Sequence, residues 1–142
     1  MPRIELWMTV LAGLSGGLAG VLWSGFVTTP WLARLAVAAE PSPTDTAARV
    51  LAGSALRGSG GAALGFLFWL GWGLIAIVGQ PWYVIGLLYG LLIWTATVAP
   101  VLGTLALRGH GPPRAVTAHA VEWLFTCLAI GLLCALSWHR YA

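Results

Sequence analysis

Fifty consecutive residues, 58–107, contain no Asp, Glu, Lys, Arg or His. As one straight helix rising about 1.5 Å per residue, this stretch would be about 75 Å long, more than twice the ~30 Å hydrocarbon core of a bilayer. The chain must therefore turn back, and Pro81 provides the break because proline cannot donate to a continuing helix. The sequence predicts two spanning helices, 59–79 and 82–107, joined as a tight hairpin that forms the core of the chain.

The rest of the chain is nearly as apolar. Charged residues make up 8% of the 142, whereas a soluble domain carries about 25% and needs them to cover a water-facing surface. Further apolar runs predict a first span at 5–29, ending before Pro30, and a fourth at 115–138. The predicted fold is all-α, a polytopic membrane protein with four transmembrane helices in a compact bundle. The chain forms one domain, and its one sizeable connection, 32–57, contains an amphipathic helix.

Seven arginines and no lysines predict the orientation. Five arginines fall on one side of the predicted spans and two on the other: Arg34, Arg49, Arg57, Arg108 and Arg114 against Arg3 and Arg140. The positive-inside rule then places the 32–57 and 108–114 connections in the cytoplasm and both termini outside. We expect an integral protein of the bacterial inner (plasma) membrane. The arginines are too scattered for a nucleic-acid patch, so no nucleic-acid partner is expected.

Small residues recur at four-residue spacing in three of the predicted helices. This small-xxx-small pattern lets helix backbones approach closely in lipid, where van der Waals packing replaces the hydrophobic drive. The pattern is compatible with packing inside the bundle and with self-association through an exposed face. The predicted packing positions are Ala12, Gly16, Gly20, Ser24, Gly61, Gly65, Gly86 and Gly90.

His119 and Glu122 form the most distinctive polar pattern. Their i,i+3 spacing puts both side chains on one face of the fourth predicted helix. Ionisable groups inside spans are costly and usually pair or function. One interpretation is an ion-pair latch from Glu122 to Arg108, Arg114 or Arg57, and the other is a proton site with His119 as relay. Two ligands do not make a metal site, and no metal or haem is predicted.

Aromatic residues also gather towards the middle of the predicted hairpin. Trp69 and Trp94 at mid-depth each need a partner for the indole N–H, because lipid offers none, and the partner expected is a Thr hydroxyl or a carbonyl, with that of Ala96 as a candidate. Packing is one interpretation, and a slot for a flat apolar ligand such as a quinone or lipid is the other. The candidate slot residues are Phe66, Trp69, Trp72, Tyr89 and Trp94.

Three functional hypotheses follow from these patterns. The leading one is a non-enzymatic accessory or scaffold subunit that packs against another membrane protein or a second copy, because packing features are rich and chemical motifs sparse. The alternative is a small oligomeric transporter that uses Glu122 as a proton-coupling carboxylate. The third is a quinone- or lipid-handling membrane enzyme. No catalytic residue and no cofactor is predicted, although a lipid or quinone would fit the aromatic slot, and membrane lipid is an expected partner.

Overall fold

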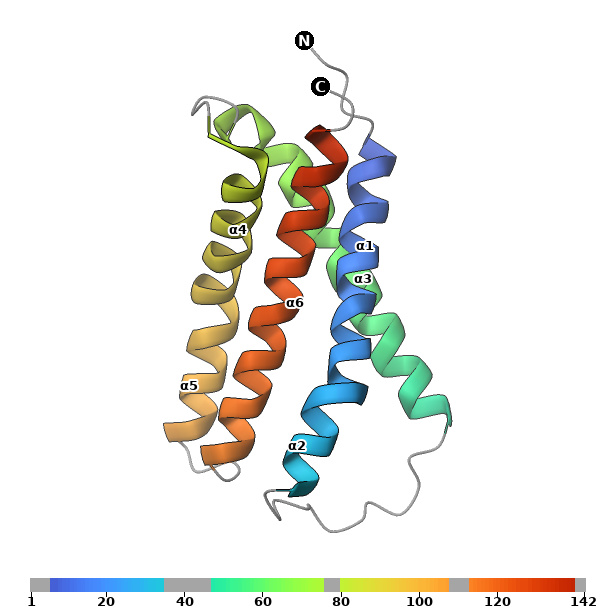
Figure 1. Cartoon of the computed structure of the whole chain (residues 1–142), viewed down its shortest axis with the longest axis vertical. Helices are drawn as coiled ribbons and strands as arrows, with labels where there is room; N and C mark the ends of the chain where they lie inside the picture. The colour runs from blue at the N-terminus through green and yellow to red at the C-terminus, as the bar shows by residue number, and fades with distance from the viewer. Residues whose placement is uncertain (1–5, 35–46, 76–79, 108–112, 140–142) are drawn as a thin grey trace.

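The computed structural model describes residues 6–34, 47–75, 80–107 and 113–139, which form four long helical segments (Figure 1). The first segment runs through α1 (Leu6–Trp23), the π-helix η1 (Ser24–Thr28) and α2 (Thr29–Arg34). The second is α3 (Ala47–Ile75). The third runs through α4 (Trp82–Ile93), the π-helix η3 (Trp94–Val98) and α5 (Ala99–Leu107), and the fourth is α6 (Pro113–His139). None of the described residues lies in a strand.

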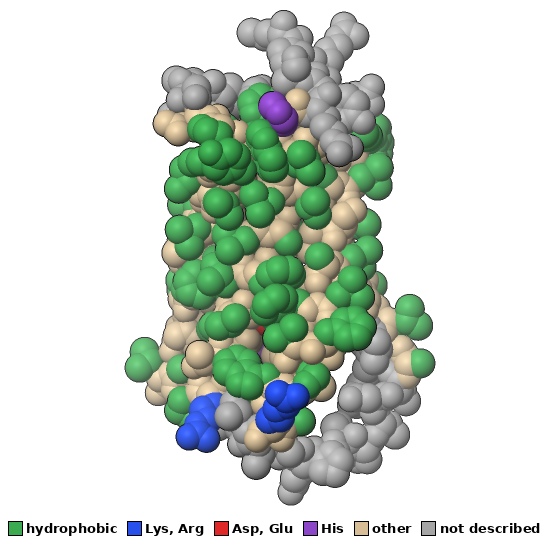
Figure 2. All heavy atoms as spheres, viewed as in Figure 1, with side chains coloured by type: hydrophobic (Ala, Val, Ile, Leu, Met, Phe, Trp, Pro, Cys, Tyr) green, Lys and Arg blue, Asp and Glu red, His purple; other side chains and the backbone are tan. Residues whose placement is uncertain are grey.

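Three of these segments are long and apolar enough to cross a membrane: Leu6–Arg34, Trp82–Thr104 and Pro113–His139. Apolar side chains cover the visible face of the molecule along most of its height, and the arginines in view lie at one end (Figure 2). The predicted all-helical character is therefore confirmed for the described residues, and three segments have the length and apolar composition that crossing a membrane needs. The predicted span at 59–79 falls within α3 up to Ile75, and its crossing of the membrane stays a prediction.

The predicted break at Pro81 matches the start of α4. Pro81 caps that helix with an extended backbone, ψ 141°, and its carbonyl accepts the backbone N–H of Val84 at 3.0 Å. Proline suits this place because the first helical N–H groups have no partner within the helix. The predicted third span, 82–107, therefore has the observed bounds of α4–η3–α5.

Pro30 does not end the first helix, contrary to the sequence-based expectation. The helix continues to Arg34 because a π-helical turn precedes the proline, with the backbone N–H of Thr29 bonded to the carbonyl of Ser24. The same device precedes Pro100, where the N–H of Ala99 bonds to the carbonyl of Trp94. A wider turn accommodates a ring that has no N–H and would clash with the carbonyl four residues back.

Close backbone contacts determine which helices are neighbours. Helix α1 packs against both α3 and α6, and α4 packs against α6. A Cβ on Gly16 would lie 2.6 Å from the Cα of Ile130 in α6, and one on Gly65 would lie 2.5 Å from the carbonyl oxygen of Thr9 in α1. These positions therefore have no room for a side chain, and the small residues pack helices within the chain.

The predicted glycine positions serve two separate interfaces of α1 and one of α4. Gly16 and Gly20 face α6, whereas Gly61 and Gly65 of α3 face the other side of α1. The α4–α6 contact is formed by glycines from both helices, and Gly131 of α6 was not among the predicted positions. Ala12 and Ser24 are half-buried. At the α4–α6 contact, a Cβ on Gly86 would clash with the backbone of Gly131, and a Cβ on Gly90 would clash with the backbone of Cys127.

The expected tight hairpin of α3 and α4 is not the closest helix pair. Helix α3 crosses behind α1, and its N-terminal half diverges from the bundle (Figure 1). The two helices meet through bulky side chains, with Phe68 edge-on to Tyr89 at a centroid distance of 4.9 Å. Glycines bring α3 to α1 and α4 to α6, but large residues keep α3 and α4 apart, so α3 and α4 are not among the closest helix pairs although they are neighbours in sequence.

The core lies where α3, α4 and α6 converge, near the end of the bundle that holds the start of α1 and the end of α6 (Figure 1). Its buried side chains are Phe68, Ile85, Ile130, Cys134 and Ala135. Tyr89 packs against this cluster, and its hydroxyl donates to the carbonyl of Leu64 in α3 at 2.8 Å. This hydrogen bond and the Phe68 contact link α3 to α4.

Replacing Tyr89 with Phe should lower the free energy of unfolding by about 1 kcal/mol. The substitution keeps the ring against Phe68 and removes only the bond to Leu64, and a typical intramolecular hydrogen bond contributes about that much. The measurement is unfolding of the detergent-solubilised protein followed by circular dichroism. Tyr83→Phe is the matched control, since Tyr83 is exposed. Equal effects of the two substitutions would contradict the assigned role of the hydroxyl.

The connection predicted at 32–57 is partly resolved into helix. The first residues of this connection, up to Arg34, belong to α2. From Ala47 onward the residues belong to α3, which continues without a break into the apolar run. The predicted amphipathic helix is thus, from Ala47, the first part of α3, while residues 35–46 lie outside the described ones. Leu6 and His139 lie at the same end of the bundle (Figure 1), and the membrane side of that end stays a prediction.

Candidate functional site

Glu122 is the only acidic residue in the four described stretches, and its side chain is fully buried, with 0% exposed. It lies about 13 Å along α6 from Pro113, at the usual rise per residue. Such a carboxylate is costly in a membrane protein unless it is paired. One carboxylate oxygen, Oε1, forms an ion pair with Nη2 of Arg57, and the other, Oε2, lies 3.4 Å from Nδ1 of His119.

Arg57 connects three helices. It belongs to α3 and pairs with Glu122 of α6, and its Nη1 donates to the carbonyl of Gly20 in α1 at 3.1 Å. A helical carbonyl is within reach because Gly17, one turn earlier in α1, has no side chain to hold α3 away, so the Arg57 backbone comes directly against it. Gly20 in turn lies against Thr126 of α6. The glycine contacts therefore create the geometry of the ion pair.

Trp123 covers the guanidinium. The Cζ of Arg57 lies 5.4 Å from the centroid of its ring, a cation–π distance. No functional role was predicted for Trp123 from the sequence, although its position next to Glu122 is a signal that could have been used. Arg57 was one of three candidate partners. Arg57 and Arg108 directly flank the charge-free run of fifty residues, so sequence position alone did not distinguish between them.

The other two candidate arginines do not pair with Glu122 within the described residues. Arg114 precedes Glu122 by eight residues, about 12 Å along α6. It lines a pocket of about 300 Å³ with Trp31, Pro113 and Thr117 at the end of the bundle. Arg108 lies outside the described residues. The i,i+3 prediction for His119 and Glu122 agrees with the observed contact, while the latch partner is Arg57.

A second pocket, of about 290 Å³, lies on the far side of Arg57 from the core. Helices α1, η1, α2 and α3 line it, and Arg57 contributes to its wall with a side chain that is 21% exposed. Gly25 and Gly53 leave open space, because a Cβ at either position would meet nothing within 4 Å. The full set of lining residues is Val21, Ser24, Gly25, Thr29, Gly53, Ser54 and Arg57.

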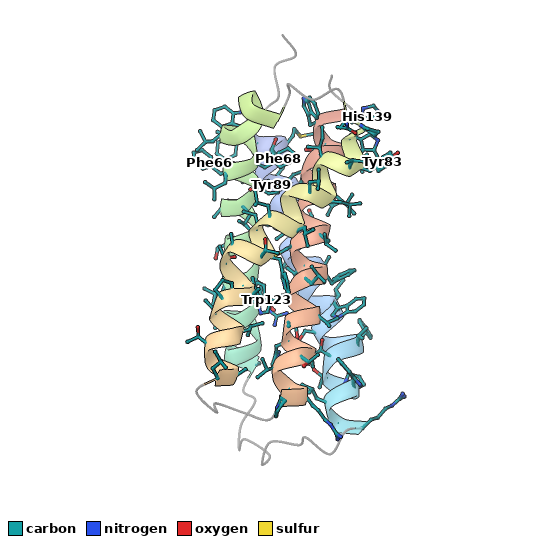
Figure 3. All side chains as sticks on the ribbon, turned by 90° about the vertical axis from the view of Figure 1, so that its left-hand side faces the viewer. Phe66, Phe68, Tyr83, Tyr89, Trp123 and His139 are labelled. Carbon is teal, nitrogen blue, oxygen red and sulfur yellow. The ribbon has the colours of Figure 1, made fainter. Side chains whose placement is uncertain are left out.

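The predicted aromatic slot stays a prediction, and its described residues face different surroundings. Phe66 is exposed and stacks on Trp69 at 6.0 Å, whereas Tyr89 points inward to Phe68 (Figure 3). Residues two apart in a helix, such as Phe66 and Phe68, lie on nearly opposite sides. The side chain of Trp72 is not among those that the structure describes. Neither of the pockets described above is lined by a slot residue.

Trp94, the last slot candidate, faces α6. Its indole N–H donates to the carbonyl of Ala120 at 3.0 Å. A Thr hydroxyl or a carbonyl was expected as the partner, and the observed carbonyl belongs to α6 and not to the candidate Ala96. Ala120 lies two residues before Glu122, so the π-helical turn that begins at Trp94 is attached next to the charged cluster.

Comparison of the chain with protein-family models, curated proteins and solved structures finds no match. The fold and the cluster define the class: a helical bundle with three segments of membrane-spanning length, in which Arg57 and His119 flank the buried carboxylate of Glu122.

Proposed function

We propose that this chain is a small membrane transport protein in which Glu122 takes up and releases the coupled proton. The observation that carries the proposal is the placement of Glu122, which is fully enclosed yet lies 3.4 Å from His119, whose side chain is 49% exposed. An imidazole changes charge near physiological pH. It therefore offers a route for a proton between the surface and a carboxylate that has no direct access to water.

The interruptions of the helices support the same proposal. Gly20, whose carbonyl accepts a hydrogen bond from Arg57, lies four residues before η1. Trp94, whose indole donates to the carbonyl of Ala120 near Glu122, is the first residue of η3. Single π-helical turns are frequent at functional sites. Both helices that flank the cluster thus lose their regular hydrogen-bond ladder close to it, which gives α2 and α5 points at which to change direction during a transport cycle.

Infrared difference spectroscopy of the purified protein, titrated with acid, tests the proposal. We expect a protonated-carboxyl band that is absent in Glu122→Gln and retained in the control Arg114→Gln. His119→Gln should keep the band but slow its appearance after a pH jump, because the relay is removed. A carboxylate that stays ionised over the whole pH range in which the fold survives would overturn the proposal.

The accessory or scaffold role is retained as a second candidate because of one feature of α3. Its N-terminal half leaves Leu51 70% and Leu56 74% exposed and carries Gly53 without a neighbour. The predicted glycine faces of α1 no longer support this role, because contacts within the chain occupy them. Native mass spectrometry from mild detergent tests it: a stable dimer or a stoichiometric companion lost in Leu51→Ser/Leu56→Ser supports it, and monomer alone contradicts it.

A further inference from the structure

We infer that the pocket beside Arg57 binds a small carboxylate anion, and that this anion replaces Glu122 as the partner of the guanidinium when Glu122 is protonated. The inference rests on the proposed function and names its substrate class. Arg57 is the link, since it pairs with Glu122 and also lines the pocket.

Charge balance favours this exchange. With Glu122 ionised, the pair with Arg57 is neutral, and an anion entering the pocket would add an uncompensated negative charge beside it. If a proton arrives with the anion, it binds a carboxylate oxygen of Glu122, Arg57 keeps its charge, and the anion supplies the negative one. The cluster is neutral before and after, so one proton and one monovalent anion bind together.

Among the described residues, the cation with a permanent charge that pairs with Glu122 is Arg57. Helix α3 contributes Arg57 and α6 contributes His119, while α1, η1 and η3 bring no ionisable side chain. Arg57 therefore cannot turn to another carboxylate within the described residues when Glu122 is protonated. A guanidinium without its carboxylate is a strong binding site for another one, because its planar N–H groups match that geometry.

The dimensions of the pocket limit the anion. About 290 Å³ corresponds to roughly ten water molecules at ~30 Å³ each, so the part of a ligand that sits in the pocket has on the order of ten non-hydrogen atoms. Gly25 and Gly53 keep the space open, and the surrounding helices contribute apolar surface from Val21. These features favour a small organic acid over a large lipid headgroup.

The experiment adds sodium acetate to the purified protein in weak buffer and follows proton uptake with an indicator dye and Glu122 by its infrared band. We expect one proton taken up per acetate bound, and no uptake with chloride at equal ionic strength. Gly53→Leu should abolish acetate-linked uptake, because the new side chain fills the pocket, while Gly103→Leu, also in open space but on α5, should not.

Two further variants separate the steps. Glu122→Gln should bind acetate with an affinity that no longer depends on pH, and Arg57→Lys should weaken binding at least tenfold, because lysine lacks the planar pair of donors. Acetate binding without proton uptake, or uptake unchanged by Gly53→Leu, would overturn the inference. If Glu122 protonates with pH but acetate has no effect, only the inference fails. If Glu122 never protonates, the proposed function fails as well.

Discussion

Replacing Gly16 with Leu should lower the free energy of unfolding by about 3 kcal/mol or more. The Cβ alone would lie 2.6 Å from the Cα of Ile130, which is backbone and cannot rotate away. Overpacking of a well-filled interior costs about 1–3 kcal/mol and occasionally more, and a leucine adds three further carbons to the clash. Helix α1 must then move off α6. The measurement is unfolding in mixed micelles followed by circular dichroism.

Gly60→Leu is the matched control for this prediction. Gly60 is also helical, but a Cβ there meets nothing within 4 Å. Both substitutions gain the same helix propensity, about 1 kcal/mol over glycine, so their difference isolates the clash. Equal stability of the two variants would show that the α1–α6 contact at Gly16 is not as close as described.

Replacing Arg57 with Gln should destabilise the protein by about 3–5 kcal/mol. The substitution leaves Glu122, whose side chain is fully buried, without its cation, and the loss of one partner from a buried ion pair typically costs that much. The hydrogen bond to the Gly20 carbonyl and the contact with Trp123 are lost as well. The same unfolding measurement at neutral pH determines the effect.

A double-mutant cycle separates the charge from the packing. Arg57→Gln combined with Glu122→Gln should recover at least half of the loss, because two neutral amides leave no uncompensated charge. Arg114→Gln is the control, since Arg114 is exposed at the first turn of α6 and should change stability by less than about 0.5 kcal/mol. An effect of Arg57→Gln no larger than that of Arg114→Gln would contradict the assigned ion pair.

Local chemistry explains what could be predicted from the sequence. The bounds of α4–η3–α5 follow from Pro81 and the apolar run after it, and the shared face of His119 and Glu122 follows from helical spacing alone. The continuation of the first helix past Pro30 was missed, because a proline normally ends a helix and a π-helical turn has no clear sequence signal.

The sequence by itself determined the apolar helices, the place where the chain turns and the existence of one costly carboxylate, because these depend on residue type and on spacing within a single helix. Only the tertiary structure decided that Arg57 pairs with Glu122, that the glycines of α1 serve α3 and α6, and that the aromatic residues diverge. Those outcomes depend on how each helix is rotated and which helices touch. The close approach of backbones at the glycines sets the rotation of each helix and its neighbours, and the spacing of residues along one helix does not reveal either.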